Sequence, residues 1–190
     1  SDYRFGYKAK GTIDTLKEYE NIYSYKAEII DFELEDDKNK ISSKHIRELV
    51  KEGEILKANK YLGRYYKIRG EVVHGRHRGR TLNFPTANLD LSFPYVIPRD
   101  GVYLTRIFVR DKYYYALTNI GSNPTFETSQ DKKIESYIYD FDKHIYGENI
   151  SVEFIEFFRP DFKFNSAEEL IDQMDKDKAQ GLEYIEKHLK

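Results

Sequence analysis

The chain has 190 residues, which is enough for one complete domain and part of a second. Its formal net charge is −2, so no overall attraction draws it to nucleic acid or to an anionic membrane surface. The absence of cysteine excludes disulfides and thiolate metal sites and fits a reducing compartment, so we expect a cytoplasmic protein. No apolar run approaches the ~20 residues of a transmembrane helix.

The first elements that the pattern predicts are a helix and a strand. Thr12 can cap a helix that runs to Tyr23, because apolar residues recur there at helical spacing. Between Tyr25 and Glu35, apolar and acidic residues alternate, and this period of two predicts a half-buried strand.

Two short helices follow. Ser42 or Ser43 caps the first, which Gly53 ends, and the second runs to Leu62. The pattern changes at Gly63, where we expect a domain boundary.

Beyond Gly63 the chain is rich in strand-forming residues. Val, Ile, Tyr and Phe gather in segments separated by turn residues. These segments are Tyr65–Val73, Gly101–Val109, Tyr113–Ile120, Ile134–Phe141 and Ile150–Phe158. Regularly spaced strands without intervening helices predict a closed antiparallel barrel, which leaves no exposed edge.

A final helix is predicted near the end of the sequence. Ser166 and Glu169 form a capping box at its start. Apolar residues at helical spacing should form its buried stripe, namely Leu170, Met174, Leu182, Ile185 and Leu189.

The segment from Gly75 to Leu89 is the main candidate for chemistry. Glycines let backbone N–H groups approach an anion, and the interspersed arginines add donors suited to phosphate. The segment ends in Pro-Thr-Ala-Asn, and the oxygens of Thr86 and Asn88 are ligands of the kind that Mg²⁺ accepts. It is not a Walker A loop. The alternative is a surface turn before a barrel strand, in which both side chains bond the turn backbone.

This segment resembles the signature of riboflavin kinases, and further blocks in the same order strengthen the resemblance. They are Gly101-Val102-Tyr103, Asn119 to Phe126, Glu135 ahead of Asp140-Phe141, Tyr146-Gly147, Arg159 and Lys163-Phe164. The resemblance implies a mainly β fold, a six-stranded Greek-key barrel with a C-terminal helix. It also implies an ATP:riboflavin 5′-phosphotransferase that makes FMN, with ATP and riboflavin as substrates and Mg²⁺ as the metal.

The resemblance also implies roles for single residues. Glu135 would be the catalytic base, Thr86 and Asn88 would hold Mg²⁺, and Arg159 would bind the flavin. ATP would bind at Gly75, Gly79, Arg80, Thr86 and Asn88. His77 and Asn83 stand where the family often has glycine. For Glu135 and Arg159 the alternative is an ordinary surface residue.

Upstream, the chain resembles the tail of the FMN adenylyltransferase domain of bacterial bifunctional FAD synthetases. The matching motifs are Asp2 to Gly6 and Ile41 to Arg47, with Lys44 where those enzymes usually have Thr. The resemblance implies a partial α/β nucleotidyltransferase remnant in residues 1–62 and a riboflavin kinase domain in residues 63–190.

In an intact adenylyltransferase, the resemblance places Ser42, Ser43 and Arg47 on the ATP phosphates, whereas the alternative is an ordinary helix cap. This sequence contains no H-x-G-H motif. We therefore expect FAD formation only in a longer parent protein.

Two other functions compete with the kinase. One is a non-catalytic flavin- or nucleotide-binding regulatory barrel, which the joint presence of Thr86, Asn88 and Glu135 disfavours. The other is a nucleic-acid-binding barrel that uses the three arginines of residues 76–80, which the acidic charge balance disfavours. We expect small-molecule substrates, with neither nucleic acid nor membrane as a partner.

Overall fold

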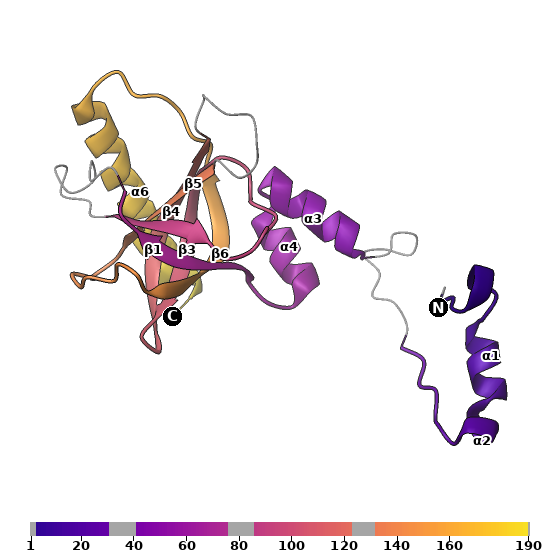
Figure 1. The fold of residues 1–190 in the computed structure, drawn as a ribbon. Coiled ribbons are helices and arrows are strands. Elements are labelled where there is room, and N and C mark those ends of the chain that lie inside the picture. Colours follow the sequence, from indigo (N-terminus) through magenta and orange to yellow (C-terminus); the bar gives the residue numbers. More distant parts are fainter. Residues whose placement is uncertain (1–2, 31–40, 76–85, 123–131, 190) are drawn as a thin grey trace. The chain divides into compact units, whose positions relative to one another are not determined.

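The computed structural model describes residues 3–30, 41–75, 86–122 and 132–189 (Figure 1). It divides the chain into two compact units, Ser1–Ser43 and Lys44–Lys190. None of the described helices is long and apolar enough to cross a membrane.

The described part of the first unit is helical. It contains η1 (Tyr7–Ala9), α1 (Ile13–Glu18) and α2 (Glu20–Tyr23). Thr12 caps α1 as predicted, because its hydroxyl accepts a hydrogen bond from the Thr15 N–H and the Thr15 hydroxyl accepts one from the Thr12 N–H. The predicted helix is interrupted at Tyr19, so it forms two short helices instead of one.

The predicted strand from Tyr25 to Glu35 is wrong in its described part, because residues 25–30 form no regular secondary structure. The Tyr25 hydroxyl donates to the Leu16 carbonyl at 2.5 Å, and the Glu20 carboxylate accepts from the Ala27 N–H at 2.7 Å. These local bonds tie the segment to α1 and α2 and take the place of a sheet partner. Residues 31–35 lie outside the described residues.

Two helices, α3 (Ser43–Glu52) and α4 (Ile55–Leu62), precede the barrel, as the sequence predicts. Gly53 and Gly63 follow them with φ of 78° and 63°. This left-handed conformation ends a helix and favours glycine. Leu49, Val50 and Ala58 form the buried cluster that packs the pair together.

Six strands of the described chain close into an antiparallel barrel in the order β1-β2-β5-β4-β3-β6 (Figure 1). They are β1 (Tyr66–Val73), β2 (Thr86–Leu91), β3 (Gly101–Val109), β4 (Lys112–Ser122), β5 (Lys132–Ile138) and β6 (Asn149–Arg159). The predicted barrel is therefore confirmed. The pattern alone did not single out β2, which places Thr86 and Asn88 on a strand.

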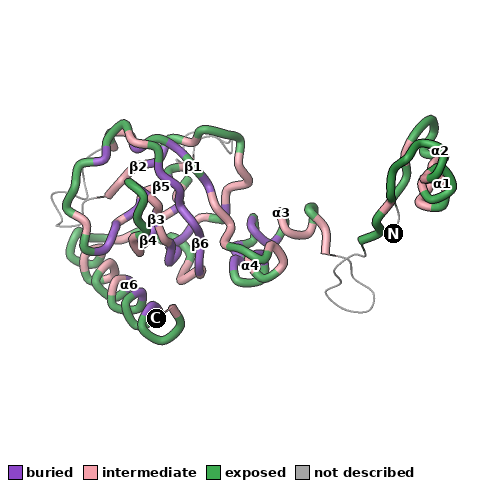
Figure 2. Tube along the Cα trace, turned by 90° about the horizontal axis from the view of Figure 1, so that it is seen from below, coloured by how far each residue is buried: buried purple, intermediate pink, exposed green. Residues whose placement is uncertain are grey.

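The barrel interior follows from the period of two along each strand. Ile68, Tyr103, Ile120, Ile134 and Phe154 come from five different strands and are at most 1 % exposed (Figure 2). The interior also holds a chain of hydroxyl groups. Thr118 bonds Thr105 on β3 and Ser136 on β5, each at 2.8 Å, so these buried polar groups are satisfied.

The turn between β3 and β4 is a two-residue hairpin, since Val109 pairs with Lys112. Arg110 and Asp111 both adopt positive φ, 48° and 62°, which is the geometry that matches the twist of paired strands. Arg110 also makes an ion pair with Glu148 and so ties this hairpin to the turn before β6.

The C-terminal helix α6 (Ala167–His188) packs on the outer face of the barrel (Figure 1). The Ser166 hydroxyl accepts from the Glu169 N–H at 3.2 Å, which confirms half of the predicted capping box. The Glu169 carboxylate accepts a hydrogen bond from the Asn165 N–H at 2.9 Å instead of from the Ser166 N–H that a full capping box requires.

The predicted buried stripe of α6 is partly wrong. Leu182 is 48 % exposed, whereas Asp177, Gly181 and Ile185 are the buried residues of the helix. These three lie four residues apart and face the barrel together. The stripe contains a glycine and an aspartate, so apolar periodicity does not mark it.

Gly181 sets how closely α6 approaches the barrel, which gives a stability test. A Cβ at this position would lie 2.2 Å from the Tyr139 hydroxyl oxygen. We expect Gly181→Ala to lower the free energy of unfolding by about 1–3 kcal/mol through overpacking, despite the ~1 kcal/mol that alanine contributes in a helix. Adding Tyr139→Phe should restore most of the loss. Urea unfolding measures the stability of the single and the double variant. A Gly181→Ala variant more stable than wild type would contradict the close packing of α6 on Tyr139.

Candidate functional site

Three neighbouring strands bring the predicted catalytic residues together. Asn88 of β2 lies directly opposite Glu135 of β5, and Glu135 lies directly opposite Asn119 of β4. Thr86, two residues before Asn88, pairs with Tyr137. Directly paired residues project from the same face of a sheet, so all of these side chains share one face.

This face is the outside of the barrel. Ile134 and Ile138 of β5 are buried in the interior, so Glu135 points outward and is half-buried. Tyr137 and Tyr139 follow on the same side, with ring centroids 5.8 Å apart in edge-to-face contact.

Gly75 joins this group through close contact with Asn88. A Cβ on Gly75 would lie 2.3 Å from Nδ2 and 2.6 Å from Oδ1 of Asn88. The backbone of Gly75 therefore packs directly against the Asn88 amide, and no larger residue fits there without moving it. The predicted ATP-binding residues Gly79 and Arg80 lie outside the described residues, as do His77 and Asn83.

Asn119 is a site residue to which sequence reasoning gave no role. Its Oδ1 is buried and has no hydrogen-bond partner among the described residues. Leaving a buried carbonyl without a donor costs about 1–3 kcal/mol, so such a group is explained by a ligand, an ion or a water. The sequence did offer one signal for Asn119, which is that it opens the Asn-Ile-Gly-Ser-Asn-Pro-Thr-Phe block.

The donor set fits a hard divalent cation. Thr86 offers a hydroxyl, Asn88 and Asn119 offer amide oxygens, and Glu135 offers a carboxylate, all of which suit Mg²⁺. The described residues hold no group of three or more His, Cys, Asp or Glu that would form a separate metal site. The unpaired Oδ1 of Asn119 is the observation that agrees with a bound cation or ligand.

Asp100 fixes the strand ends beside this face. Its carboxylate accepts from the Ser122 N–H at 3.0 Å and lies 2.9 Å from Lys132 Nζ. Burial raises the pKa of Asp100, but the hydrogen bonds from Ser122 and Lys132 outweigh burial and lower the pKa overall. The charged carboxylate thus joins the end of β4 to the start of β5.

Arg159, the predicted flavin residue, is held by α6. Its Nε and Nη2 both bond the Asp177 carboxylate, with the Nη2 contact at 2.7 Å. Gln173 adds a third bond to Asp177 at 2.8 Å, so the carboxylate is fully engaged. The guanidinium lies over the Phe162 ring at 4.6 Å and the Phe164 ring at 6.0 Å, so a cation stacks on two aromatic rings there.

The segment after Arg159 meets the end of β4 close to Asn119. A Cβ on Gly121 would lie 3.4 Å from Asp161 Oδ2 and 3.7 Å from Asn119 Nδ2. Burial raises the pKa of the Asp161 carboxyl, although the Phe162 N–H and Arg159 act against this. The predicted flavin segment and the predicted catalytic face are therefore neighbours.

The predicted anion site of the N-terminal remnant stays a prediction. Ser43 begins α3, and Arg47 lies on that helix with its side chain exposed. The division between the two compact units falls after Ser43, between these residues.

Comparison with known proteins identifies relatives of this fold. The family model described as Flavokinase: Riboflavin kinase matches residues 62–185. A bifunctional riboflavin kinase/FMN adenylyltransferase from Listeria monocytogenes is 41 % identical over 176 residues, which cover 93 % of this chain and 55 % of the relative. The chain thus spans a little more than half the length of that protein.

Two further relatives bear on structure and partners. A crystal structure titled Macrolide-efflux Protein from Streptococcus pneumoniae matches with a TM-score of 0.82 and 37 % identity, over 94 % of this chain and 57 % of that one. The RNA-binding riboflavin kinase RibR of Bacillus subtilis is 37 % identical over 110 residues, which cover 58 % of this chain and 47 % of that protein. The absence of a nucleic-acid partner therefore stays a prediction.

The pair of Arg159 and Asp177 gives a second stability test. Asp177→Leu leaves the Arg159 side chain, only 16 % exposed, without its carboxylate. We expect the free energy of unfolding to fall by about 3 kcal/mol, because an unpaired buried charge is costly. The double variant Arg159→Met/Asp177→Leu should recover most of this loss, since an apolar pair needs no counter-ion. Urea unfolding of Asp177→Leu at the wild-type midpoint would contradict the pairing.

Proposed function

The chain belongs to the riboflavin kinase family, and we propose that it transfers the γ-phosphoryl group of ATP to the 5′-hydroxyl of riboflavin, giving FMN and ADP. The observation that carries this proposal is the row of Asn88, Glu135 and Asn119 across three paired strands, with Thr86 on the same face. This row places a proton acceptor, the Glu135 carboxylate, beside side-chain oxygens that can face a nucleotide and its metal.

Glu135 is the proposed base. The riboflavin 5′-oxygen forms a bond to the γ-phosphorus while the bond from that phosphorus to the bridging oxygen of ADP breaks, and the hydroxyl proton passes to the Glu135 carboxylate. Phosphoryl transfer needs mainly positioning and charge neutralisation, so a base that faces the hydroxyl on a rigid strand suffices.

Thr86 and Asn88 are the proposed Mg²⁺ ligands, and Gly75 supports Asn88. Bound Mg²⁺ neutralises charge on the β- and γ-phosphates. Asn119 is assigned to the same region, where its unpaired Oδ1 can accept a hydrogen bond from a substrate hydroxyl or face the metal. The close contact of Gly75 with Asn88 supports a fixed orientation of that amide.

The proposed flavin contact is Arg159 with its aromatic neighbours. An isoalloxazine ring favours flat apolar walls with a few polar groups. The stack of Arg159 on Phe162 supports this role, as does the position of Asp161 next to Gly121 beside the catalytic face. Asp177 then acts through Arg159, since it fixes the plane of the guanidinium.

A non-catalytic regulatory barrel is not favoured. Flavin or nucleotide binding alone needs no outward carboxylate between two amides, whereas phosphoryl transfer to an alcohol uses one. The kinase relative that matches most of this chain agrees with the catalytic alternative.

We also propose residues 63–190 as the kinase domain and residues 1–62 as the end of an adenylyltransferase domain. The start of the family match at residue 62 supports this boundary. Across this boundary, α4 packs on β1 and β6 in one compact unit with the barrel. Ser42, Ser43 and Arg47 are proposed to act only in the longer protein.

The direct test of the kinase is FMN formation by the purified chain with riboflavin, ATP and Mg²⁺, followed by chromatography. Glu135→Gln keeps the shape of the side chain and removes the proton acceptor, so kcat should fall by ~10²-fold or more while ATP binding changes little. Ser151→Ala, on the opposite strand β6, serves as a control that should keep wild-type turnover. Near-normal turnover of Glu135→Gln would remove Glu135 from the mechanism.

The metal ligands are tested through the magnesium requirement. Thr86→Val and Asn88→Leu each delete an oxygen donor, so the Mg²⁺ concentration for half-maximal rate should rise. Thr86→Ser is the matched control, because it keeps the hydroxyl and should keep the requirement near that of wild type. An unchanged requirement in both Thr86→Val and Asn88→Leu would show that these residues serve only the strand.

A further inference from the structure

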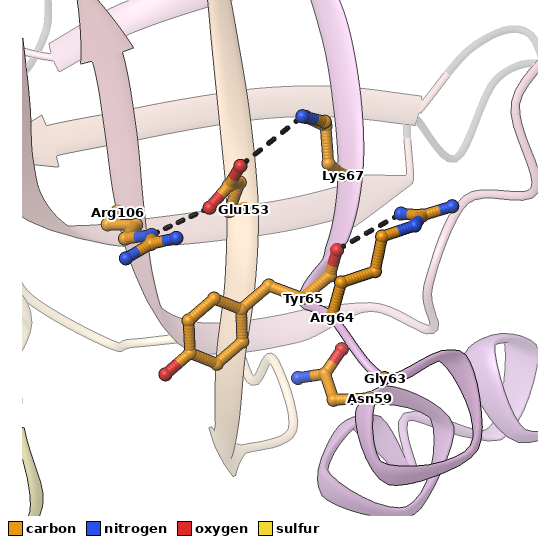
Figure 3. Close-up of a pocket in the computed structure, with 7 residues that line it drawn as sticks. All are labelled: Asn59, Gly63, Arg64, Tyr65, Lys67, Arg106 and Glu153. Carbon is orange, nitrogen blue, oxygen red and sulfur yellow. Dashed lines mark hydrogen bonds and ion pairs between the residues drawn. The ribbon is translucent and has the colours of Figure 1, made fainter.

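The barrel carries a polar pocket on the side away from the proposed catalytic face. Its volume is about 430 Å³, and it opens where α4 passes into β1 (Figure 3). Its lining residues are Asn59, Gly63, Arg64, Tyr65, Lys67, Arg106 and Glu153. In the closed strand order, β6 with Glu153 stands three strands from β5 with Glu135 in either direction. The pocket is therefore separate from the proposed kinase site.

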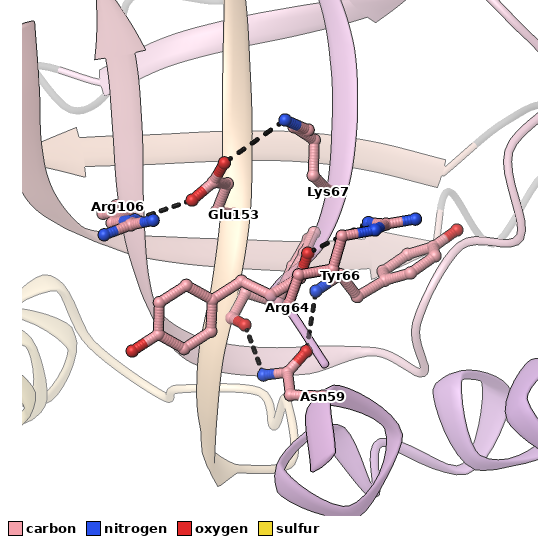
Figure 4. A network of polar contacts seen from close by, with 8 residues as sticks. Asn59, Arg64, Tyr66, Lys67, Arg106 and Glu153 are labelled. Atoms are coloured by element: carbon pink, nitrogen blue, oxygen red, sulfur yellow. Dashed lines mark hydrogen bonds and ion pairs between the residues drawn. The ribbon is translucent and has the colours of Figure 1, made fainter. Parts of the chain in front are cut away.

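Charge in this pocket is unbalanced. Glu153 is 5 % exposed and faces two cations, with Arg106 Nε at 2.6 Å and Lys67 Nζ at 3.4 Å (Figure 4). Among the described residues, Arg64 has no acidic partner, and its guanidinium bonds only the Tyr65 carbonyl at 3.3 Å. Three cations against one carboxylate leave an excess of two positive charges in the pocket.

The Arg106 guanidinium is held in a fixed plane with donors to spare. Its centre lies 4.7 Å from the Tyr65 ring and 4.4 Å from the Tyr113 ring, and the ion pair to Glu153 uses only Nε. Its Nη1 and Nη2 groups have no hydrogen-bond partner among the described residues. An immobilised guanidinium with unused N–H groups is suited to the two oxygens of a phosphate.

The floor of the pocket is also rigid. Asn59 of α4 donates from Nδ2 to the Phe154 carbonyl at 2.9 Å and accepts from the Tyr66 N–H at 2.6 Å (Figure 4). Its amide is thus used to join α4 to β1 and β6. Gly63 then turns the chain with a φ of 63°, which brings Arg64 to the rim opposite Arg106. Glu153 holds Arg106 and Lys67 in place before any ligand arrives, so these two cations need little ordering on binding.

We propose that this pocket binds the phosphate end of a small phosphorylated molecule, through Arg64, Lys67 and Arg106. A phosphate monoester carries about two negative charges at neutral pH, which matches the excess positive charge. The volume lies in the range of sites for small organic ligands. Glu153 orients Arg106 and Lys67 and limits the pocket to ligands that outcompete a single carboxylate.

The test is a titration of the isotope-labelled chain with inorganic pyrophosphate in the absence of Mg²⁺, followed by amide NMR shifts. We expect saturable shifts at Gly63, Arg64 and Lys67 and none at Asn88 or Glu135. Arg64→Gln should weaken binding about tenfold or more, because it removes a charge-assisted hydrogen bond. Arg69→Gln is the matched control, since Arg69 is an exposed arginine on β1, five residues after Arg64, and does not line the pocket.

Repeating the titration with ADP and with FMN distinguishes the sources of the phosphate. If ADP or FMN binds and its binding weakens in Arg64→Gln, the ligand of the pocket is an organic phosphate. If only pyrophosphate binds, the ligand is an inorganic phosphate. Arg64→Gln should keep wild-type FMN formation, which shows that it folds. No saturable binding of any probe, or equal weakening by Arg64→Gln and Arg69→Gln, would overturn the proposal.

Discussion

The antiparallel pairing of β5 with both β2 and β4 is the constraint on which the candidate site depends. It aligns Asn88, Glu135 and Asn119 in one row. A slip of one residue would turn Glu135 into the interior, because side chains alternate between the two faces. The register is held from inside the barrel, where Ser136 bonds Thr118 and Ile134 is 1 % exposed. The packing of β5 in the barrel interior therefore holds Glu135 in place on the outer face.

The C-terminal helix adds a second constraint, on the flavin side. Gly181 allows α6 to lie against Tyr139, and one turn earlier Asp177 reaches Arg159 from the same face of the helix. The helix is therefore placed by a contact that any larger residue would disturb. That placement delivers a buried carboxylate, 3 % exposed, to Arg159, which lies over Phe162. The same stripe of α6, which contains Asp177 and Gly181, therefore sets both the position of the helix and the ion pair with Arg159.

The barrel could be predicted from the sequence because its strands alternate strongly and their ends carry turn residues. The same period of two puts Glu135 on one face with Tyr137 and Tyr139, and the structure shows that this face is the outer one. It did not single out β2, whose short run of Thr, Ala and Asn lacks a strand composition, and it gave Asn119 and Asp177 no role. Both are polar residues whose importance lies in partners distant in sequence. The alternation from Tyr25 was misleading because local bonds to Leu16 and Glu20 replace a sheet partner.

Two glutamates on the outside of the barrel show how neighbours decide what a carboxylate does. Glu153 lies between Arg106 and Lys67, so its oxygens are used in ion pairs and it anchors those cations. Glu135 lies between Asn88 and Asn119, which are neutral, and among the described residues no cation pairs with it. A carboxylate held by two cations has its oxygens engaged in those ion pairs. A carboxylate between two amides keeps its oxygens available for a substrate hydroxyl. The strand pattern is the same in both places, and the cross-strand partners distinguish Glu153, which anchors two cations, from Glu135, the proposed base.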